Sequence, residues 1–104
     1  MKNLLVLFGG VSPEHEVSLR SAEFVLSHID RLKYNVYAVG ITKEGQWKYY
    51  PSEDYAAIRE NHWQEADGVC DAALSPSWGQ GLLILKPQGL EIVPIHCCFP
   101  VLHG

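Results

Sequence analysis

Apolar residues in the first forty positions switch between continuous runs and a helical spacing. Residues 2–8 do not alternate, which predicts a strand buried on both faces. From about residue 14 to residue 30 the apolar positions recur every three or four residues and form one stripe: Leu19, Ala22, Val25, Leu26 and Ile29. Residues 35–41 form a second apolar run. The order strand, helix, strand predicts a βαβ unit with a parallel strand pair.

The segment between the first strand and the helix is rich in turn-forming residues. Gly9 and Gly10 end the strand, and Ser12, Pro13 and Glu14 have the pattern of a helix start. The hydroxyl can cap the helix, proline suits its first position, and the acid suits the positive end of its dipole. Beyond them, Ser18 and Ser21 are interpreted as residues on the helix surface.

The rest of the chain predicts shorter elements. In order, they are a strand at 47–50 that returns at the sheet edge, a short helix within 52–61, a brief strand at 72–74, strands at 81–85 and 90–93 joined by a tight turn, and a core strand at 96–102. Tyr55, Ile58 and Trp63 are expected to face inward. Four aromatic residues have two possible interpretations, either packing over the sheet edge or forming a subunit contact: Trp47, Tyr49, Tyr50 and Trp63. The whole predicts one α/β domain with a small antiparallel hairpin insertion.

Composition excludes several classes of function. The 104 residues fit one domain, and twelve acidic against eight basic residues give a net charge of −4 without any basic stripe, which argues against nucleic acid binding. No apolar run approaches the roughly 20 residues that cross a membrane. The first run is also too short for a signal peptide. Cys70, Cys97 and Cys98 lack the spacing of a disulfide framework, so we expect small buried thiols in a reducing cytosol.

Candidate chemistry gathers at the two glycine-terminated strand ends. Gly9 and Gly10 match neither dinucleotide nor phosphate-loop motifs, so they form a turn alone or a turn that also shapes a site. The Glu14-His15-Glu16 run lacks the second histidine of a helical zinc motif. Its glutamates are either solvated partners of the helix dipole or, for one of them, the holder of a cationic group such as an amine.

The last strand reaches His103, a residue with two interpretations. A histidine at a strand end is often only a surface residue. Ligands of open α/β sheets, however, bind beyond the carboxyl ends of the strands. If the first and last strands are neighbours, Glu14 and His103 converge and can handle an ammonium group or a proton. The chain then stops, which suggests a domain cut from a longer protein.

Three blocks of sequence resemble D-alanine–D-alanine ligases, in the order found in that family. They are residues 7–22 (LFGGVSPEHEVSLRSA), 40–47 (GITKEGQW) and 99–104 (FPVLHG). The resemblance implies that residues 1–104 are the first-substrate, N-terminal domain of an ATP-grasp ligase whose other domains are absent. The implied fold is the pre-ATP-grasp domain: a Rossmann-like, open, mainly parallel sheet flanked by helices.

The resemblance also implies an activity and a site. The family joins two D-alanines through an acyl phosphate for peptidoglycan, in the cytoplasm, with ATP and magnesium. Glu14 matches the catalytic residue that holds the ammonium of the first D-alanine, and His103 matches a residue that supports it. Val17 matches a position near the small side chain, and Gly9 with Gly10 shapes the pocket floor. ATP and magnesium would bind outside this chain, and the family usually forms homodimers through this domain.

Some alternatives stay open. Residues 61–85 look closer to the longer, vancomycin-resistance type, which includes D-alanine–D-serine ligases, so the second substrate is D-alanine, D-serine or D-lactate. A stand-alone α/β module that binds a small ligand or pairs subunits is a rival interpretation. The matching domain of another ATP-grasp ligase is a third, against which the Glu-His-Glu-Val-Ser-Leu run argues.

Overall fold

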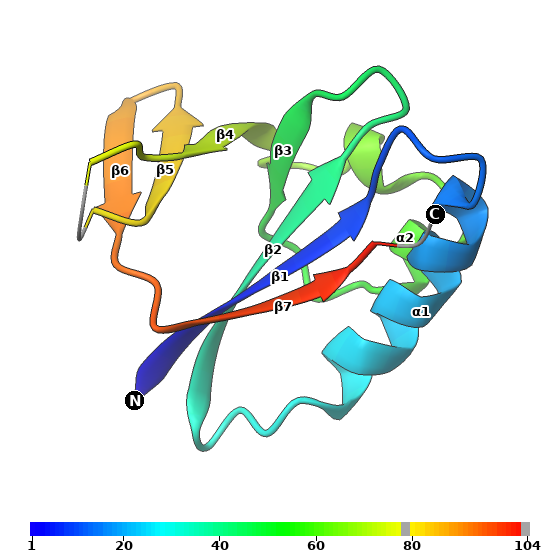
Figure 1. The fold of residues 1–104 in the computed structure, drawn as a ribbon, viewed down its shortest axis with the longest axis horizontal. Coiled ribbons are helices and arrows are strands. Elements are labelled where there is room, and N and C mark those ends of the chain that lie inside the picture. The colour runs from blue at the N-terminus through cyan, green and yellow to red at the C-terminus, as the bar shows by residue number, and fades with distance from the viewer. Residues whose placement is uncertain (78–79, 103–104) are drawn as a thin grey trace.

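One sheet organises the chain in the computed structural model, which describes residues 1–77 and 80–102. Its strand order is β6-β5-β4-β3-β2-β1-β7 (Figure 1). The elements are β1 (Lys2–Gly9), α1 (His15–His28), β2 (Tyr34–Ile41), β3 (Trp47–Tyr50), α2 (Ala56–Arg59), the 3₁₀ helix η1 (Trp63–Glu65), β4 (Cys70–Leu74), β5 (Leu82–Lys86), β6 (Gly89–Val93) and β7 (Cys97–Val101). The chain is therefore α/β, as the hydrophobic pattern predicted.

The expectation of a mainly parallel sheet is wrong. β1 pairs in parallel with β2 and with β7, but the other four pairings of the described residues are antiparallel. The connections explain the difference. Only a long crossover such as α1 can return the chain to start a parallel strand. A short turn such as the one at residues 42–46 reverses the chain, so it yields an antiparallel neighbour.

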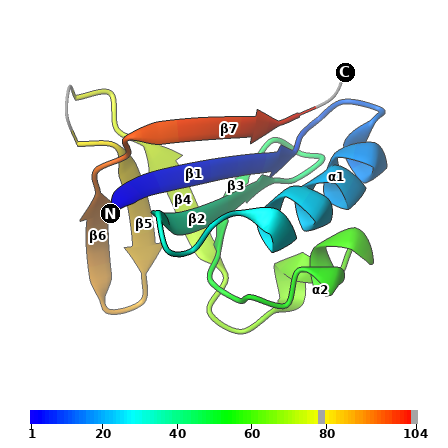
Figure 2. The same ribbon diagram turned by 90° about the horizontal axis from the view of Figure 1, so that it is seen from below.

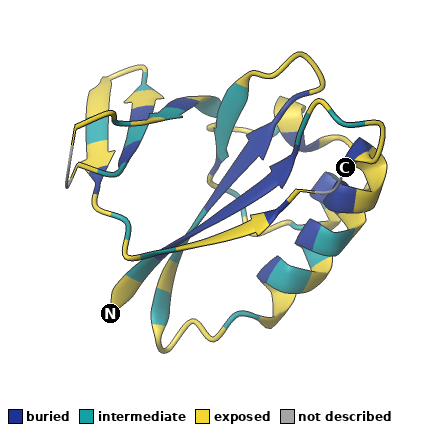
Figure 3. Ribbon diagram, viewed as in Figure 1, coloured by how far each residue is buried: buried dark blue, intermediate teal, exposed yellow. Residues whose placement is uncertain are grey.

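The positions of β3 and β7 in the sheet also differ from expectation. β3 is not an edge strand, because β4 pairs with its free side. β5 and β6 pair antiparallel through Lys86 and Gly89 and continue the same sheet to its far edge. The last strand, expected in the core, is an edge strand of the described sheet. Of its residues only Val101 is buried (Figure 3).

The helices cover one face of the sheet rather than both (Figure 2). Beneath α1 and α2 lies the main core, which combines β1 with the apolar stripe of α1: Leu4, Val6, Phe8, Leu19, Ala22, Leu26, Ala38, Tyr50, Ile58, Trp63 and Val101. The opposite face has a second core of Leu5, Leu7, Val39, Ala72, Leu82, Ile84 and Val93. Residues of β5 and β6 share this core with residues of β1, although three strands separate β5 from β1 in the sheet and four separate β6 from β1, so the sheet curves strongly.

Local details correct three smaller expectations. α1 begins at His15 with Glu14 as its N-cap, and Ser12 instead accepts a hydrogen bond from the Glu14 N–H at 3.0 Å. The four aromatic residues form no single patch, because Tyr50 and Trp63 belong to the helix-side core while Trp47 and Tyr49 pack on the other. The cysteines are free, but none of them is fully buried: Cys70 and Cys97 are partly exposed, and Cys98 is the most exposed of the three although part of it is covered. Partial burial raises the pKa of its thiol.

Gly40 on β2 lies very close to two aromatic rings of the main core. The Trp63 ring packs edge-on against Phe8 with 5.0 Å between ring centroids, and both rings lie directly over the Gly40 backbone. A Cβ atom at position 40 would overlap both rings. The absent side chain is therefore what allows Trp63 to seal this end of the core.

We expect Gly40→Ala to destabilise the fold by about 1–3 kcal/mol, because overpacking forces neighbouring rings out of place. Denaturant unfolding measures the change. The same substitution in a Trp63→Leu background should cost clearly less, since the smaller side chain leaves room for the methyl group. An equal cost in both backgrounds would show that the overlap with Trp63 is not the cause.

Candidate functional site

The carboxyl ends of β1, β2 and β7 meet at one edge of the sheet. In the register, Phe8 pairs with Val101 and Gly9 pairs with Ile41. The loop after β1 also lies beside the end of β7, because a Cβ atom on Gly10 would come 3.8 Å from Leu102 Cδ2. The first and last strands are thus neighbours, which is the condition for convergence of the predicted site. His103 itself lies outside the described residues, so its approach to Glu14 stays a prediction.

The turn at Gly9 and Gly10 depends on conformations that suit glycine, with φ of 82° and 112°. A Cβ atom on Gly9 would also overlap the Ile41 carbonyl oxygen. The turn is tied down by hydrogen bonds: Gly9 N–H donates to Ser18 Oγ at 2.7 Å and Gly10 N–H to Ile41 O at 2.8 Å. Both amides are occupied within the fold. This turn therefore does not suit the phosphates of a nucleotide, which need free backbone N–H groups.

Two buried side chains of α1 hold this turn, and sequence reasoning missed both. His15 Nδ1 donates to the Gly10 carbonyl oxygen at 2.7 Å. Ser18, interpreted as a surface residue, is fully buried and links Gly9 to Val101. A signal was present in the sequence. Positions 15 and 18 have the same helical spacing as the buried Leu19, Ala22 and Leu26, so they fall on the face that packs on the sheet.

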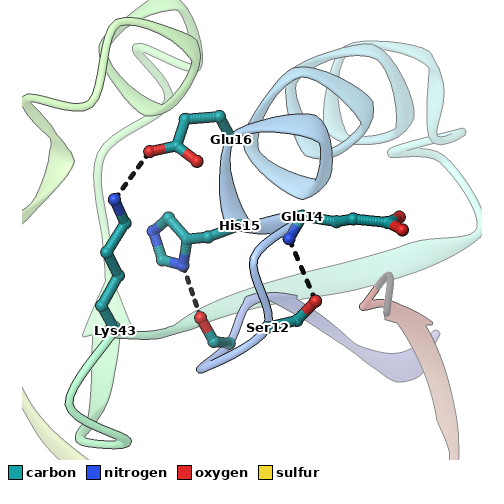
Figure 4. Close-up of polar contacts among 6 residues, drawn as sticks. Ser12, Glu14, His15, Glu16 and Lys43 are labelled. Atoms are coloured by element: carbon teal, nitrogen blue, oxygen red, sulfur yellow. Dashed lines mark hydrogen bonds and ion pairs between the residues drawn. The ribbon is translucent and has the colours of Figure 1, made fainter.

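Glu14 is the carboxylate that remains available at this edge. Its side chain extends away from His15, Glu16 and Lys43 (Figure 4). Glu14 is exposed, and among the described residues its carboxylate has no hydrogen-bond or ion-pair partner. Val17, 39% exposed, follows three positions later and so lies on the same side of the helix.

Glu16 has a different environment. Its carboxylate accepts a hydrogen bond from Lys43 Nζ at 2.7 Å, across to the turn after β2 (Figure 4). That hydrogen bond lowers the pKa of the Glu16 carboxyl below its ordinary value. Both side chains are more than half exposed, so water screens the pair. Of the two neighbouring glutamates, Glu16 is thus already paired and Glu14 is free to bind a ligand.

The candidate site lies at the carboxyl edge of the sheet. A cavity of about 410 Å³ lies elsewhere, between the first half of β2 and the segment after β3, where Arg31, Tyr34 and Tyr55 contribute to its wall. None of the predicted site residues that the structure describes lines it. Within residues 1–77 and 80–102, no cluster of His, Cys, Asp or Glu is arranged to bind a metal ion. No helix in the same ranges has the length and apolar character needed to cross a membrane.

Comparisons with known proteins agree on one family. Residues 3–104 match the family model described as D-ala D-ala ligase N-terminus. Over 103 residues the chain is 40% identical to the D-alanine--D-alanine ligase of Thermoanaerobacter sp. (strain X514). The matched region covers 99% of this chain and 28% of that protein. The chain is also 41% identical over 104 residues to the vancomycin C-type resistance protein VanC1 of Enterococcus gallinarum, covering 100% of this chain and 28% of that protein.

A solved structure supports the same grouping. The crystal structure of the VanG D-Ala:D-Ser ligase from Enterococcus faecalis superposes with a TM-score of 0.87 at 35% identity, covering 99% of this chain and 29% of that one. The chain spans only 28% of the length of the curated relatives named above. Together, the matched model, the identities and the shared fold show that this chain belongs to the D-alanine–D-alanine ligase family and corresponds to its N-terminal part.

Proposed function

We propose that residues 1–104 form the first-substrate domain of a longer ATP-dependent ligase that joins D-alanine to a second amino acid or hydroxy acid. The observation that carries this proposal is the Glu14 carboxylate, which has no partner among the described residues and lies at the N-terminus of α1, where the ends of β1 and β7 meet. An available carboxylate on an anchored backbone suits the ammonium group of an amino acid. Membership of the ligase family supplies the substrate class.

The proposed roles follow from where each residue lies. Glu14 binds the ammonium group of the first D-alanine, and His103 supports that contact from the chain that follows β7. Val17 lies beside the methyl group, a small apolar partner for a small side chain, while Gly9 and Gly10 form the floor. Holding the amino end fixes the direction of the carboxylate, and orientation of reactants supplies a large part of catalysis.

Phosphorylation of that carboxylate to an acyl phosphate is the chemistry that ATP and magnesium supply in this proposal. The glycine turn does not suit the phosphates of ATP, because both of its amides are bonded within the fold. We therefore assign both to other parts of the longer ligase. The proposal includes the pre-ATP-grasp, Rossmann-like class for the fold of this domain. It also includes a cytoplasmic location, where precursors of peptidoglycan are made. Finally, it includes a homodimer that forms through this domain.

A second candidate is a D-alanine–D-serine ligase. It is favoured by the 35% identity and TM-score of 0.87 to the VanG D-Ala:D-Ser ligase. The first D-alanine is common to both candidates, and the residues that select the second substrate are assigned to the rest of the longer protein. Both candidates therefore give the same role to Glu14.

In the complete ligase, Glu14→Gln should lower kcat/KM for the first D-alanine by roughly 10- to 100-fold, because it removes a charge-assisted hydrogen bond worth about 1.5–3 kcal/mol. Steady-state kinetics with the first substrate varied measure this. Glu16→Gln is the matched control, since Glu16 is only two residues from Glu14 but is paired with Lys43. This substitution should change kcat/KM less than threefold. An unchanged value for Glu14→Gln would refute the proposed role.

The 104-residue chain by itself should show no ATP turnover in the presence of D-alanine, because the phosphoryl-transfer machinery is assigned to other parts of the ligase. Release of inorganic phosphate, followed against a buffer blank, checks this. D-Alanine-dependent phosphate release by the purified chain would contradict the division of labour, and with it the assignment of this chain as a substrate-binding domain alone.

A further inference from the structure

Ser18 makes two hydrogen bonds that join parts of the chain more than eighty positions apart. Its Oγ accepts a hydrogen bond from Gly9 N–H at 2.7 Å and donates one to the Val101 carbonyl oxygen. Ser18 is 0% exposed, so neither partner can turn to water instead. One hydroxyl therefore satisfies the last residue of β1 and the last residue of β7 at once.

The place of this bridge is where the strand pairing stops. The ladder between β1 and β7 ends at the pair of Phe8 and Val101. One position later the chain turns at Gly9, and the backbone has no further partner on β7. Ser18 of the neighbouring helix joins the two strands at this point, so beyond the last ladder pair Gly9 and Val101 are linked through a side chain.

The same helix carries the candidate ligand-binding carboxylate. Glu14 is the N-cap residue, one turn before Ser18, and the amide of Ser18 donates to the Glu14 carbonyl oxygen at 3.1 Å. A shift of the Ser18 anchor would therefore move the first turn of α1, and Glu14 with it. The end of β7, which leads toward His103, would move relative to that turn.

We propose that Ser18 is a positioning residue for the first substrate: its hydroxyl fixes the first turn of α1 against the ends of β1 and β7, and so fixes the position of Glu14. This inference rests on the proposed function, because it takes Glu14 as the group that binds the ammonium. Ser18 does not touch the substrate. It acts through the geometry of Glu14.

A cycle of variants in the complete ligase tests this role. Ser18→Ala should raise KM for the first D-alanine about tenfold with kcat changed less than threefold, a size typical of coupled neighbours. In a Glu14→Gln background the same substitution should raise KM less than threefold, because the contact that it misplaces is already lost. Ser27→Ala, an exposed serine of the same helix, is the matched control and should leave KM unchanged.

The pair Ser18→Thr and Ser18→Val covers the case in which Ser18→Ala does not fold. The two side chains have nearly the same shape, but only threonine keeps the hydroxyl. A lower KM for Ser18→Thr than for Ser18→Val supports the inference. Equal KM values for the two, or an equal effect of Ser18→Ala with and without Glu14→Gln, would overturn it. If Glu14→Gln alone has no effect, the proposed function fails, whatever the Ser18 variants show.

Discussion

Every backbone group of the buried strand β1 needs a partner inside the protein, and this requirement organises the structure. β1 meets it by pairing with β2 on one side and β7 on the other, both in parallel. Parallel pairing brings the carboxyl ends of three strands to the same edge of the sheet. The constraint of covering one strand therefore also creates the edge where the chemistry gathers, from segments that begin and end the chain.

The same constraint explains why the loop after β1 is rigid enough to present a ligand-binding group. Gly9 and Gly10 leave the strand with backbone angles that favour glycine, and each amide is bonded within the fold. His15 and Ser18 fasten the turn from the helix side. Since these two amides are bonded within the fold, a ligand at this edge would have to bind a side chain. In the proposed function, that side chain is Glu14.

Glu14 and Glu16 are two positions apart in the sequence but have different electrostatic environments. Glu16 pairs with Lys43 of the next loop, so its charge is compensated within the protein. Glu14 sits at the positive end of the helix dipole without a cationic side chain beside it among the described residues. This difference is why we propose a ligand cation as the partner of Glu14. The difference arises from the side on which each carboxylate leaves the first turn, not from any difference in residue type.

The amino-acid sequence by itself determined the main elements, and it supplied the hypothesis of a site at their ends. A non-alternating run predicted the buried β1, helical spacing predicted the stripe of α1, and the motif around Glu14 predicted a site, because these signals are local and depend on neighbours a few positions apart. Only the tertiary structure decided the antiparallel half of the sheet and the edge position of β7. Only it revealed the role of Ser18, since helical spacing can place a serine on the buried face of a helix but cannot say which groups its hydroxyl meets there. Those groups depend on which distant segments pack against it, as Gly9 and Val101 do here.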